Sequence, residues 1–259
     1  MAERQRIAIL GGGSWATAIA KIVLNNVDEI NWYMRRQEQI DEFIRLSKNP
    51  SYLTGVKFNT DHIRFTSNIN HVVATSDILI FATPSPFLKD HLKKLNRKLN
   101  KKIIVSAIKG IVPNENLIIT EFFEQFYQVP KENIAVLAGP CHAEEVALER
   151  LSYLTLASAS RDRAKMLSQF FATSFVKTSV SEDVIGMEYA SIMKNIYSIA
   201  TGICHGLKYG DNFQAVLLSN ALQEINRFCS ATSSMHRDIN QSAYLGDLLV
   251  TAYSKKSPK

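Results

Sequence analysis

The stretch Ile7-Ala-Ile-Leu-Gly-Gly-Gly-Ser-Trp-Ala-Thr-Ala-Ile-Ala-Lys21 decides the fold of this chain. The apolar run 7–10 predicts a short buried strand, three glycines follow it, and a helical pattern of apolar residues covers 14–25. Strand, glycine turn and helix form the context in which a G-x-G-x-x-A pattern indicates dinucleotide binding. The alternative is a glycine turn that holds no ligand.

Each small residue of this pattern has its own expected role. Gly11 makes the tight turn after the strand, Gly13 lets a pyrophosphate approach the backbone, and Ala16 permits close packing of the helix on the strand. The open N–H groups at the helix start, together with the positive end of the helix dipole, favour phosphate groups. We therefore expect the turn to bind a dinucleotide.

Composition and charge are those of an ordinary globular protein, with 46% hydrophobic and 21% charged residues among 259. No apolar run reaches about 18 residues, so no membrane span is expected. The first residues lead straight into a strand, which leaves no room for a signal peptide. Three scattered cysteines without metal-ligand spacing favour reduced thiols and a cytoplasmic protein. A net charge of +6 suits an anionic small molecule and is poor evidence for nucleic acid.

Strands and helices alternate up to about residue 178, which predicts a Rossmann-like α/β fold with a doubly wound parallel sheet. After the first strand, the expected strands are 29–34, 63–66, 77–82, 102–106, 134–138, 153–159 and 175–178. The expected helices are 37–47, 87–99, 114–127 and 161–173. The basic stretch within 87–102 has no interleaved aromatic residues, so a solvated helix face is favoured over nucleic-acid binding.

Two arginines at the end of the second strand bear on the choice of cofactor. Arg35 and Arg36 follow this strand, and no carboxylate precedes Glu38. An acidic residue there would bind the ribose 2′-hydroxyl of NAD, whereas arginine suits a 2′-phosphate. The pattern favours NADPH. A solvated strand end is an equally good explanation, so NADP and NAD both stay open.

Two later strand ends also carry candidate ligand-binding residues. Lys109 follows one strand and stands before a glycine, and Gly139-Pro140-Cys141 follows another. The carboxyl ends of parallel strands share the edge at which ligands of open sheets bind. We therefore expect Lys109 and Gly139 to face the same crevice as the glycine turn.

The pattern changes after residue 178. Ser179-Val-Ser-Glu182 fits a capping box, and residues 184–204 are apolar almost all round, which predicts a central buried helix. No strand-like alternation follows. We therefore expect a dinucleotide-binding domain at 1–180 and an all-helical substrate domain at 181–259.

Lys194 stands in the middle of this apolar helix. Burial of a lysine lowers its pKa, and the small neighbours Ala190 and Ser198 leave room for a small molecule. The alternative is a lysine whose tip reaches solvent. Asp247 lies in another apolar segment, and a buried carboxylate favours a cationic partner such as Lys194. Such a lysine can protonate the oxygen of a ketone that accepts a hydride.

With these residues assembled, the chain resembles the NAD(P)-dependent glycerol-3-phosphate dehydrogenase family of bacterial type. The resemblance covers the whole length and rests on an ordered set of motifs: Gly11-Gly-Gly-Ser-Trp-Ala-Thr-Ala18, Ala82-Thr-Pro-Ser85, Ser106-Ala-Ile-Lys-Gly110, Ala138-Gly-Pro140, Glu188 through Lys194-Asn195, Gly210-Asp-Asn212 and Gly246-Asp-Leu248. It implies reversible reduction of dihydroxyacetone phosphate to sn-glycerol 3-phosphate, the backbone precursor of phospholipids.

The resemblance also implies roles for individual residues. Lys194 matches the catalytic proton donor and acceptor, and Lys109 matches a lysine that touches both cofactor and substrate. Further cofactor contacts match Ser14, Trp15, Ala143 and, at the adenosine end, Arg35 and Arg36. Further substrate contacts match Gly139, Cys141, Asp247 and Ser257, although the family more often has Ser or Thr in place of Cys141.

The end of the sequence departs from the family pattern. The family continues Ser-Arg-Asn-Arg, with an arginine that binds the substrate phosphate, whereas Ser257 is followed here by Pro258 and Lys259. On this basis we expect a truncated chain with low turnover. Two alternatives stay open: a dinucleotide-binding fragment or degenerate paralogue without catalytic activity, and a related β-hydroxyacid dehydrogenase, against which the Lys-Gly and Gly-Asp-Asn motifs argue. A homodimer is also left open.

Overall fold

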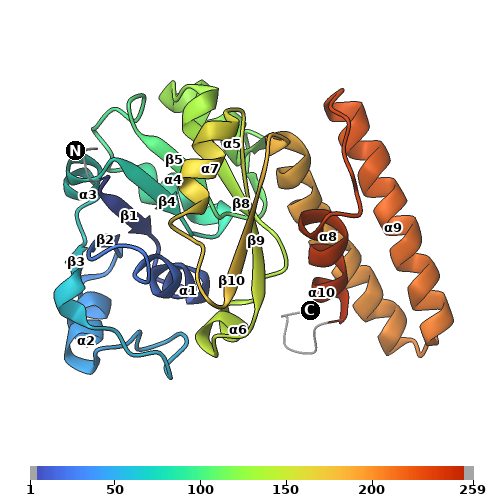
Figure 1. Ribbon diagram of the computed structural model, residues 1–259, viewed down its shortest axis with the longest axis horizontal. Helices are drawn as coiled ribbons and strands as arrows, with labels where there is room; N and C mark the ends of the chain where they lie inside the picture. Colours follow the sequence, from blue (N-terminus) through green and yellow to red (C-terminus); the bar gives the residue numbers. More distant parts are fainter. Residues whose placement is uncertain (1–4, 254–259) are drawn as a thin grey trace.

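The computed structural model describes residues 5–253, which form an eight-stranded sheet with helices on both faces and a helical layer beside it (Figure 1). The strands of the sheet are β1 (Ile7–Leu10), β2 (Ile30–Tyr33), β3 (Ile63–Thr66), β4 (Ile78–Phe81), β5 (Ile103–Ser106), β8 (Ile134–Ala138), β9 (Ser152–Ser158) and β10 (Val176–Ser181). Their order is β10-β9-β8-β5-β4-β1-β2-β3. The chain order reverses beside β1, where open α/β sheets bind dinucleotides.

Alternation along each buried strand supplies two separate cores. In β1, Ile7 and Ile9 belong to one apolar cluster, whereas Ala8 and Leu10 belong to another. The first cluster is covered by α1 (Ser14–Val23), α2 (Gln37–Leu46), α6 (Ala143–Ala147) and α7 (Arg161–Ser168). The second is covered by α3 (Ile69–Thr75), α4 (Leu88–Leu92) and α5 (Ile119–Tyr127). The doubly wound arrangement expected from the sequence is therefore confirmed.

A third apolar cluster joins the sheet to the helical layer. This layer contains α8 (Val184–Gly206), α9 (Asp211–Thr232), the π-helical turn Ser242–Gly246 and α10 (Asp247–Tyr253). Val136, Ala138 and Ala157 of β8 and β9 pack in this cluster with residues such as Met187 of α8 and Leu248 of α10. The strands β8 and β9 thus lie directly against α8, the helix that carries Lys194. None of the described helices is long and apolar enough to cross a membrane.

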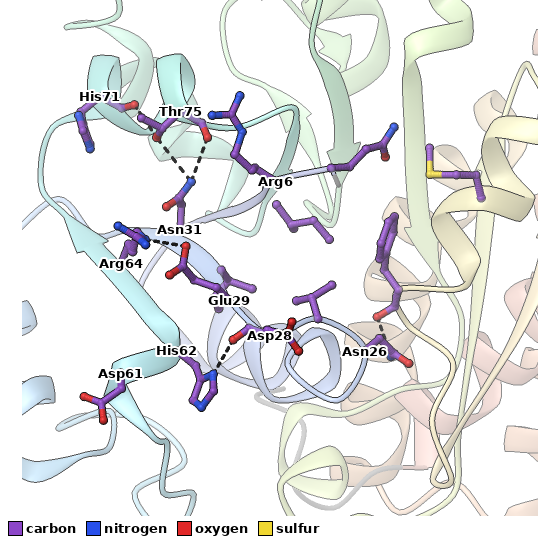
Figure 2. Close-up of a pocket in the computed structure, with 16 residues that line it drawn as sticks. Arg6, Asn26, Asp28, Glu29, Asn31, Asp61, His62, Arg64, His71 and Thr75 are labelled. Carbon is purple, nitrogen blue, oxygen red and sulfur yellow. Dashed lines mark hydrogen bonds and ion pairs between the residues drawn. The ribbon is translucent and has the colours of Figure 1, made fainter. Parts of the chain in front are cut away.

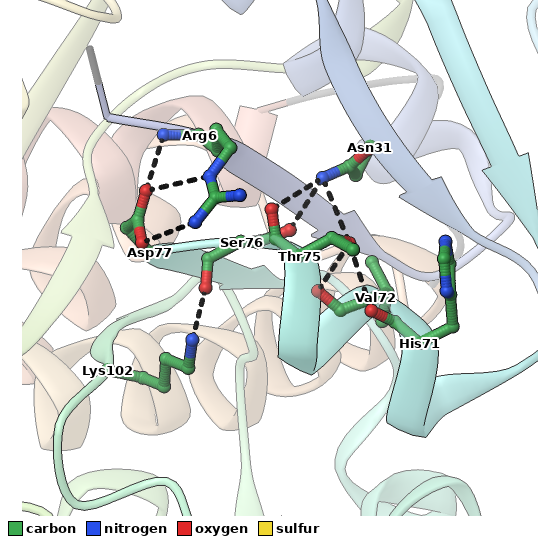
Figure 3. A network of polar contacts seen from close by, with 8 residues as sticks. All are labelled: Arg6, Asn31, His71, Val72, Thr75, Ser76, Asp77 and Lys102. Atoms are coloured by element: carbon green, nitrogen blue, oxygen red, sulfur yellow. Dashed lines mark hydrogen bonds and ion pairs between the residues drawn. The ribbon is translucent and has the colours of Figure 1, made fainter. Parts of the chain in front are cut away.

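Polar contacts hold the amino ends of the central strands together (Figure 3). Arg6 donates its backbone N–H to Asp77 at 2.9 Å and its Nε to the same carboxylate at 3.3 Å. Lys102 donates to the Ser76 carbonyl at 2.6 Å, and Asn31 Nδ2 donates to Ser76 Oγ at 2.8 Å. These contacts provide hydrogen-bond partners for polar groups at the amino ends of the strands, on the sheet edge opposite the glycine turn.

The prediction of a fully parallel sheet is wrong at one junction. β9 pairs antiparallel with β8, and β10 then pairs parallel with β9. The only helix between β8 and β9 is α6, whose 5 residues span about 7.5 Å. This helix is too short to carry the chain back along the sheet, so the next strand returns in the opposite direction.

Three predicted helices are shorter than expected by several residues. The helix predicted over 161–173 ends at Ser168. The helix predicted over 87–99 ends at Leu92, and Asn70 binds the following backbone instead, since it accepts from the Asn96 N–H at 2.8 Å and donates to the Lys94 carbonyl at 2.9 Å. The helix predicted from residue 114 begins only at Ile119. Asn114 and Asn116 have φ values of 73° and 55°, and they form the turn of a hairpin between β6 (Ile111–Val112) and β7 (Leu117–Ile118).

The start and the burial of α8 also differ from expectation. Ser179 lies within β10, and the helix is capped instead by Asp183, which accepts from the Gly186 N–H at 3.0 Å. The helix is buried on one side only, because Ile196, Ile199 and Ile203 on its other side are 57–59% exposed. Lys194 faces the buried side, opposite these isoleucines.

Candidate active site

The glycine turn has the conformation that its sequence predicts. Gly11 has φ +139°, and a Cβ there would lie 2.5 Å from the Ala82 carbonyl oxygen, so only glycine fits. Trp32 Nε1 donates to the Gly11 carbonyl at 2.7 Å. Two polar side chains bind the next carbonyl, since Gln39 and Asn49 donate to Gly12 O at 2.9 and 3.1 Å. The carbonyls of the turn are thus held by the protein.

The start of α1 leaves room for a ligand. A Cβ built on Gly13 meets nothing within 4 Å, and no side chain caps the helix. Trp15 Nε1 is buried, yet it has no hydrogen-bond partner within residues 5–253. Open backbone N–H groups at a helix start bind phosphate, so the turn fits the pyrophosphate of a dinucleotide.

The other residues predicted to contact a cofactor surround this turn. Ser14 and Trp15 form the first residues of α1, and Ala143 begins α6, which packs against α1. Arg35 and Arg36 are exposed at the carboxyl end of β2, immediately before α2. The fold therefore gathers the predicted cofactor residues along one edge of the sheet.

Lys194 and Asp247 form a buried ion pair, as the sequence led us to expect. The Lys194 ammonium on α8 donates to Asp247 Oδ1 at the start of α10, and the two residues are 4% and 2% exposed. Asp247 Oδ2 is buried without a hydrogen-bond partner in the described part of the chain. This second oxygen is free to accept a hydrogen bond from a bound molecule.

The surroundings of Lys194 favour its neutral form more than water does. Burial lowers the pKa of Lys194, the negative charge of Asp247 opposes this effect, and the positive charge of Lys109 adds to it. Lys109 therefore lies close to Lys194, although the two residues are 85 positions apart in the sequence. A lysine whose pKa is lowered toward neutrality can both give and take a proton.

The Gly139–Cys141 segment lies at the same place. Gly139 has φ +118°, and a Cβ there would lie 2.7 Å from the Tyr153 carbonyl oxygen. Burial raises the pKa of the Cys141 thiol to about 12, and the charges of Lys109 and Asp247 both act on this thiol. The structure therefore brings together four of the residues predicted to bind substrate, which are Lys109, Cys141, Lys194 and Asp247. Two other residues were predicted at this site. Gly139 belongs to the segment just described, and Ser257 lies outside the described residues.

A buried polar cluster that the sequence analysis missed holds the segment before Asp247. Asp183 accepts from Arg237 Nε at 2.5 Å, from Arg237 Nη2 at 3.1 Å and from the Tyr244 hydroxyl at 2.5 Å. Burial raises the pKa of Asp183, but these bonds outweigh burial and leave the pKa below its usual value. Arg237 is 54 positions away from Asp183, and no local pattern indicates that such distant residues pair.

A wide cavity of about 1350 Å³ lies elsewhere, at the amino ends of β1, β2 and β3 (Figure 2). Two of its polar side chains already have partners, since Arg64 pairs with Glu29 at 2.6 Å and His62 Nδ1 contacts the Asp28 backbone carbonyl oxygen at 2.5 Å. Open α/β sheets bind ligands at the opposite, carboxyl edge. The candidate active site is therefore the region of the two lysines and the glycine turn.

Comparison with known proteins agrees with this geometry. A family model described as the N-terminus of NAD-dependent glycerol-3-phosphate dehydrogenase matches residues 6–164, and the model of its C-terminus matches residues 183–258. Proteins named glycerol-3-phosphate dehydrogenase [NAD(P)+] from Bacillus pumilus and Bacillus subtilis are each 33% identical over 257 residues, which cover 98% of this chain and 74% of each relative.

Solved structures show the same relationship. The crystal structure of glycerol-3-phosphate dehydrogenase from Coxiella burnetii has a TM-score of 0.87 and 28% identity, covering 98% of this chain and 77% of that one. The enzyme structure from Dunaliella salina has a TM-score of 0.88 at 24% identity, covering 98% of this chain and 47% of that one, and it supports the fold. The chain thus belongs to the NAD-dependent glycerol-3-phosphate dehydrogenase family.

Proposed function

We propose that this chain catalyses the reversible reduction of dihydroxyacetone phosphate to sn-glycerol 3-phosphate, with NADPH or NADH as the reductant. The observation that carries the proposal is the buried Lys194–Asp247 pair, with Lys109 beside it, at the sheet edge where the glycine turn opens. The product is the backbone precursor of phospholipids, so the reaction would supply lipid synthesis.

The residues around the glycine turn fit a dinucleotide. Gly11 and Gly13 would let the pyrophosphate reach the start of α1, and Ser14, Trp15 and Ala143 would line its path. Arg35 and Arg36 would contact the adenosine end, where a 2′-phosphate pairs with guanidinium groups. When bound, the nicotinamide supplies the hydride that reduces the ketone.

The two lysines would then perform separate tasks. Negative charge develops on the ketone oxygen as the carbon accepts a hydride, and the Lys194 ammonium can stabilise that charge and deliver a proton. Asp247 holds Lys194 in place through their ion pair. Lys109 adds positive charge for the substrate phosphate, and Gly139, Cys141 and Ser257 complete the proposed substrate contacts.

The wider organisation belongs to the same proposal. We assign residues 1–180 to the cofactor and residues 181–259 mainly to the substrate, because β10 ends at Ser181 and α8 begins at Val184. A cytoplasmic location is supported by three free cysteines. A homodimer is supported by the exposed isoleucines of α8, which a second copy would remove from water. Light scattering measures the assembly state.

The experiment is to mix the purified chain with NADPH and dihydroxyacetone phosphate and to identify the product. Loss of NADPH absorbance, together with formation of sn-glycerol 3-phosphate, supports the proposal. Fluorescence titration of NADPH runs in parallel. Cofactor binding without any turnover would instead indicate a dinucleotide-binding protein that lacks catalytic activity, and the proposal would fail.

A further inference from the structure

Glu188 is a buried carboxylic acid that the proposed reaction does not use. It lies on α8 and is 4% exposed. Its Oε2 atom accepts from the Thr120 N–H at 3.2 Å and also from the Thr120 hydroxyl. Its Oε1 atom has no hydrogen-bond partner within residues 5–253. A buried, incompletely satisfied carboxyl group is costly, so its presence needs an explanation.

The Glu188 side chain supplies the cap that α5 lacks. The residue before α5 is Ile118, whose side chain makes no cap hydrogen bond, and the N–H of Thr120, the second residue of this helix, donates to Glu188. An acid at a helix start is favoured by the helix dipole. The cap comes from a helix of the other layer, so it joins the sheet part of the molecule to the helical part.

No positive charge acting on Glu188 offsets the negative charge of its ionised carboxylate within the described residues. Burial raises the pKa of Glu188 to about 7, the bonds from Thr120 lower it, and the negative charge of Glu121 on α5 raises it. On α8 itself, the neighbouring titratable group is Tyr189. The contact with α5 is therefore a capping contact and does not depend on an ion pair.

The capped segment leads directly to Lys109, one of the two lysines of the proposed site. From Lys109 the chain passes through Gly110 and the β6–β7 hairpin into α5, where Glu188 binds Thr120. On the other side, Lys194 follows Glu188 by six residues on α8, about 9 Å along the helix axis. One side chain thus connects the segment that carries Lys109 with the helix that carries Lys194.

We propose that Glu188 is a positioning residue, which fixes Lys109 relative to Lys194 by capping α5 from the neighbouring layer. Its proposed effect is transmitted through its contact with Thr120. The kinetic part of its test rests on the proposed function, whereas the exchange part does not. A displacement of about 1 Å between groups that act together can lower a rate about 100-fold.

The experiment compares Glu188→Ala with Glu188→Gln. Alanine removes the acceptor, so kcat should fall about 10- to 100-fold and the KM for dihydroxyacetone phosphate should rise, while the affinity for NADPH stays within about twofold. Glutamine keeps a carbonyl oxygen for Thr120 and should restore kcat to within about threefold of wild type. Glu124→Ala is the matched control, because Glu124 lies on α5, the helix that Glu188 caps, and its carboxylate pairs with the surface residue Lys131 at 3.4 Å.

Hydrogen–deuterium exchange gives a readout that needs no turnover. Glu188→Ala should speed exchange over residues 109–120, whereas Glu188→Gln and Glu124→Ala should not. Unchanged exchange in Glu188→Ala, or loss of kcat that Glu188→Gln does not restore, would overturn the proposal. If Glu188→Ala does not fold, the Thr120→Val variant takes its place. Faster exchange over residues 109–118 in that variant would support the proposal, and unchanged exchange would overturn it. Absence of turnover in the wild type would refute the proposed function alone.

Discussion

Replacement of Lys194 by methionine tests the buried ion pair. Methionine keeps an unbranched apolar stem, but it removes the ammonium group that binds Asp247. Asp247 is 2% exposed, and its Oδ2 atom already lacks a partner within the described residues. Loss of one member of such a pair leaves an uncompensated charge and costs about 3–5 kcal/mol. Since domains are stable by only about 5–15 kcal/mol, we expect a large loss of stability.

Replacement of both partners should reverse this loss. The double variant Lys194→Met with Asp247→Leu exchanges the ion pair for apolar side chains, a change that is neutral or stabilising by about 1–4 kcal/mol. Urea unfolding at neutral pH, followed by circular dichroism, measures the wild type, both single variants and the double variant as a cycle. A single Lys194→Met variant as stable as wild type would refute the reasoning. So would a double variant no more stable than Lys194→Met.

Three further predictions concern the glycine turn, the cofactor and Glu188. Gly13→Val should abolish NADPH binding without lowering Tm, since the space beside Gly13 is open. Gly11→Val should lower Tm because Gly11 has a φ of +139°. Equal melting temperatures of the two variants would contradict this prediction. Changing Arg35 and Arg36 to alanine should weaken NADPH about tenfold and leave NADH nearly unchanged, and equal weakening in calorimetry would argue against a 2′-phosphate contact. Burial raises the pKa of Glu188 from 4.5 to about 7, so the folded chain keeps a proton that the unfolded chain loses between these values. Wild-type stability should therefore fall relative to Glu188→Gln as pH rises through this window, by up to about 3 kcal/mol, and parallel stability curves for the two proteins would rule this out.

Local patterns allowed much of the fold and the site to be predicted. The strand, glycine turn and helix at the start of the chain are confirmed, because their conformations depend on neighbouring residues. The pairing of Asp247 with Lys194 is also confirmed, since a carboxylate in an apolar segment needs a cation and Lys194 stands in an apolar helix.

Other features could not be predicted because distant residues determine them. The antiparallel direction of β9 follows from how the chain returns past a short helix, and strand periodicity carries no information about direction. The contacts of Asp183 with Arg237 and of Glu188 with Thr120 join residues 54 and 68 positions apart. The exposed side of α8 was missed because an apolar pattern does not reveal which elements cover it.

The central claim is that Lys194 delivers the proton when dihydroxyacetone phosphate is reduced. The most direct measurement is kcat of Lys194→Ala with NADPH, under conditions in which circular dichroism shows the variant folded. Lys177→Ala, which changes an exposed lysine of β10, is the control. We predict that Lys194→Ala lowers kcat about 10²- to 10⁴-fold with little change in NADPH affinity, while the control matches wild type. Near-normal turnover by Lys194→Ala would contradict the account.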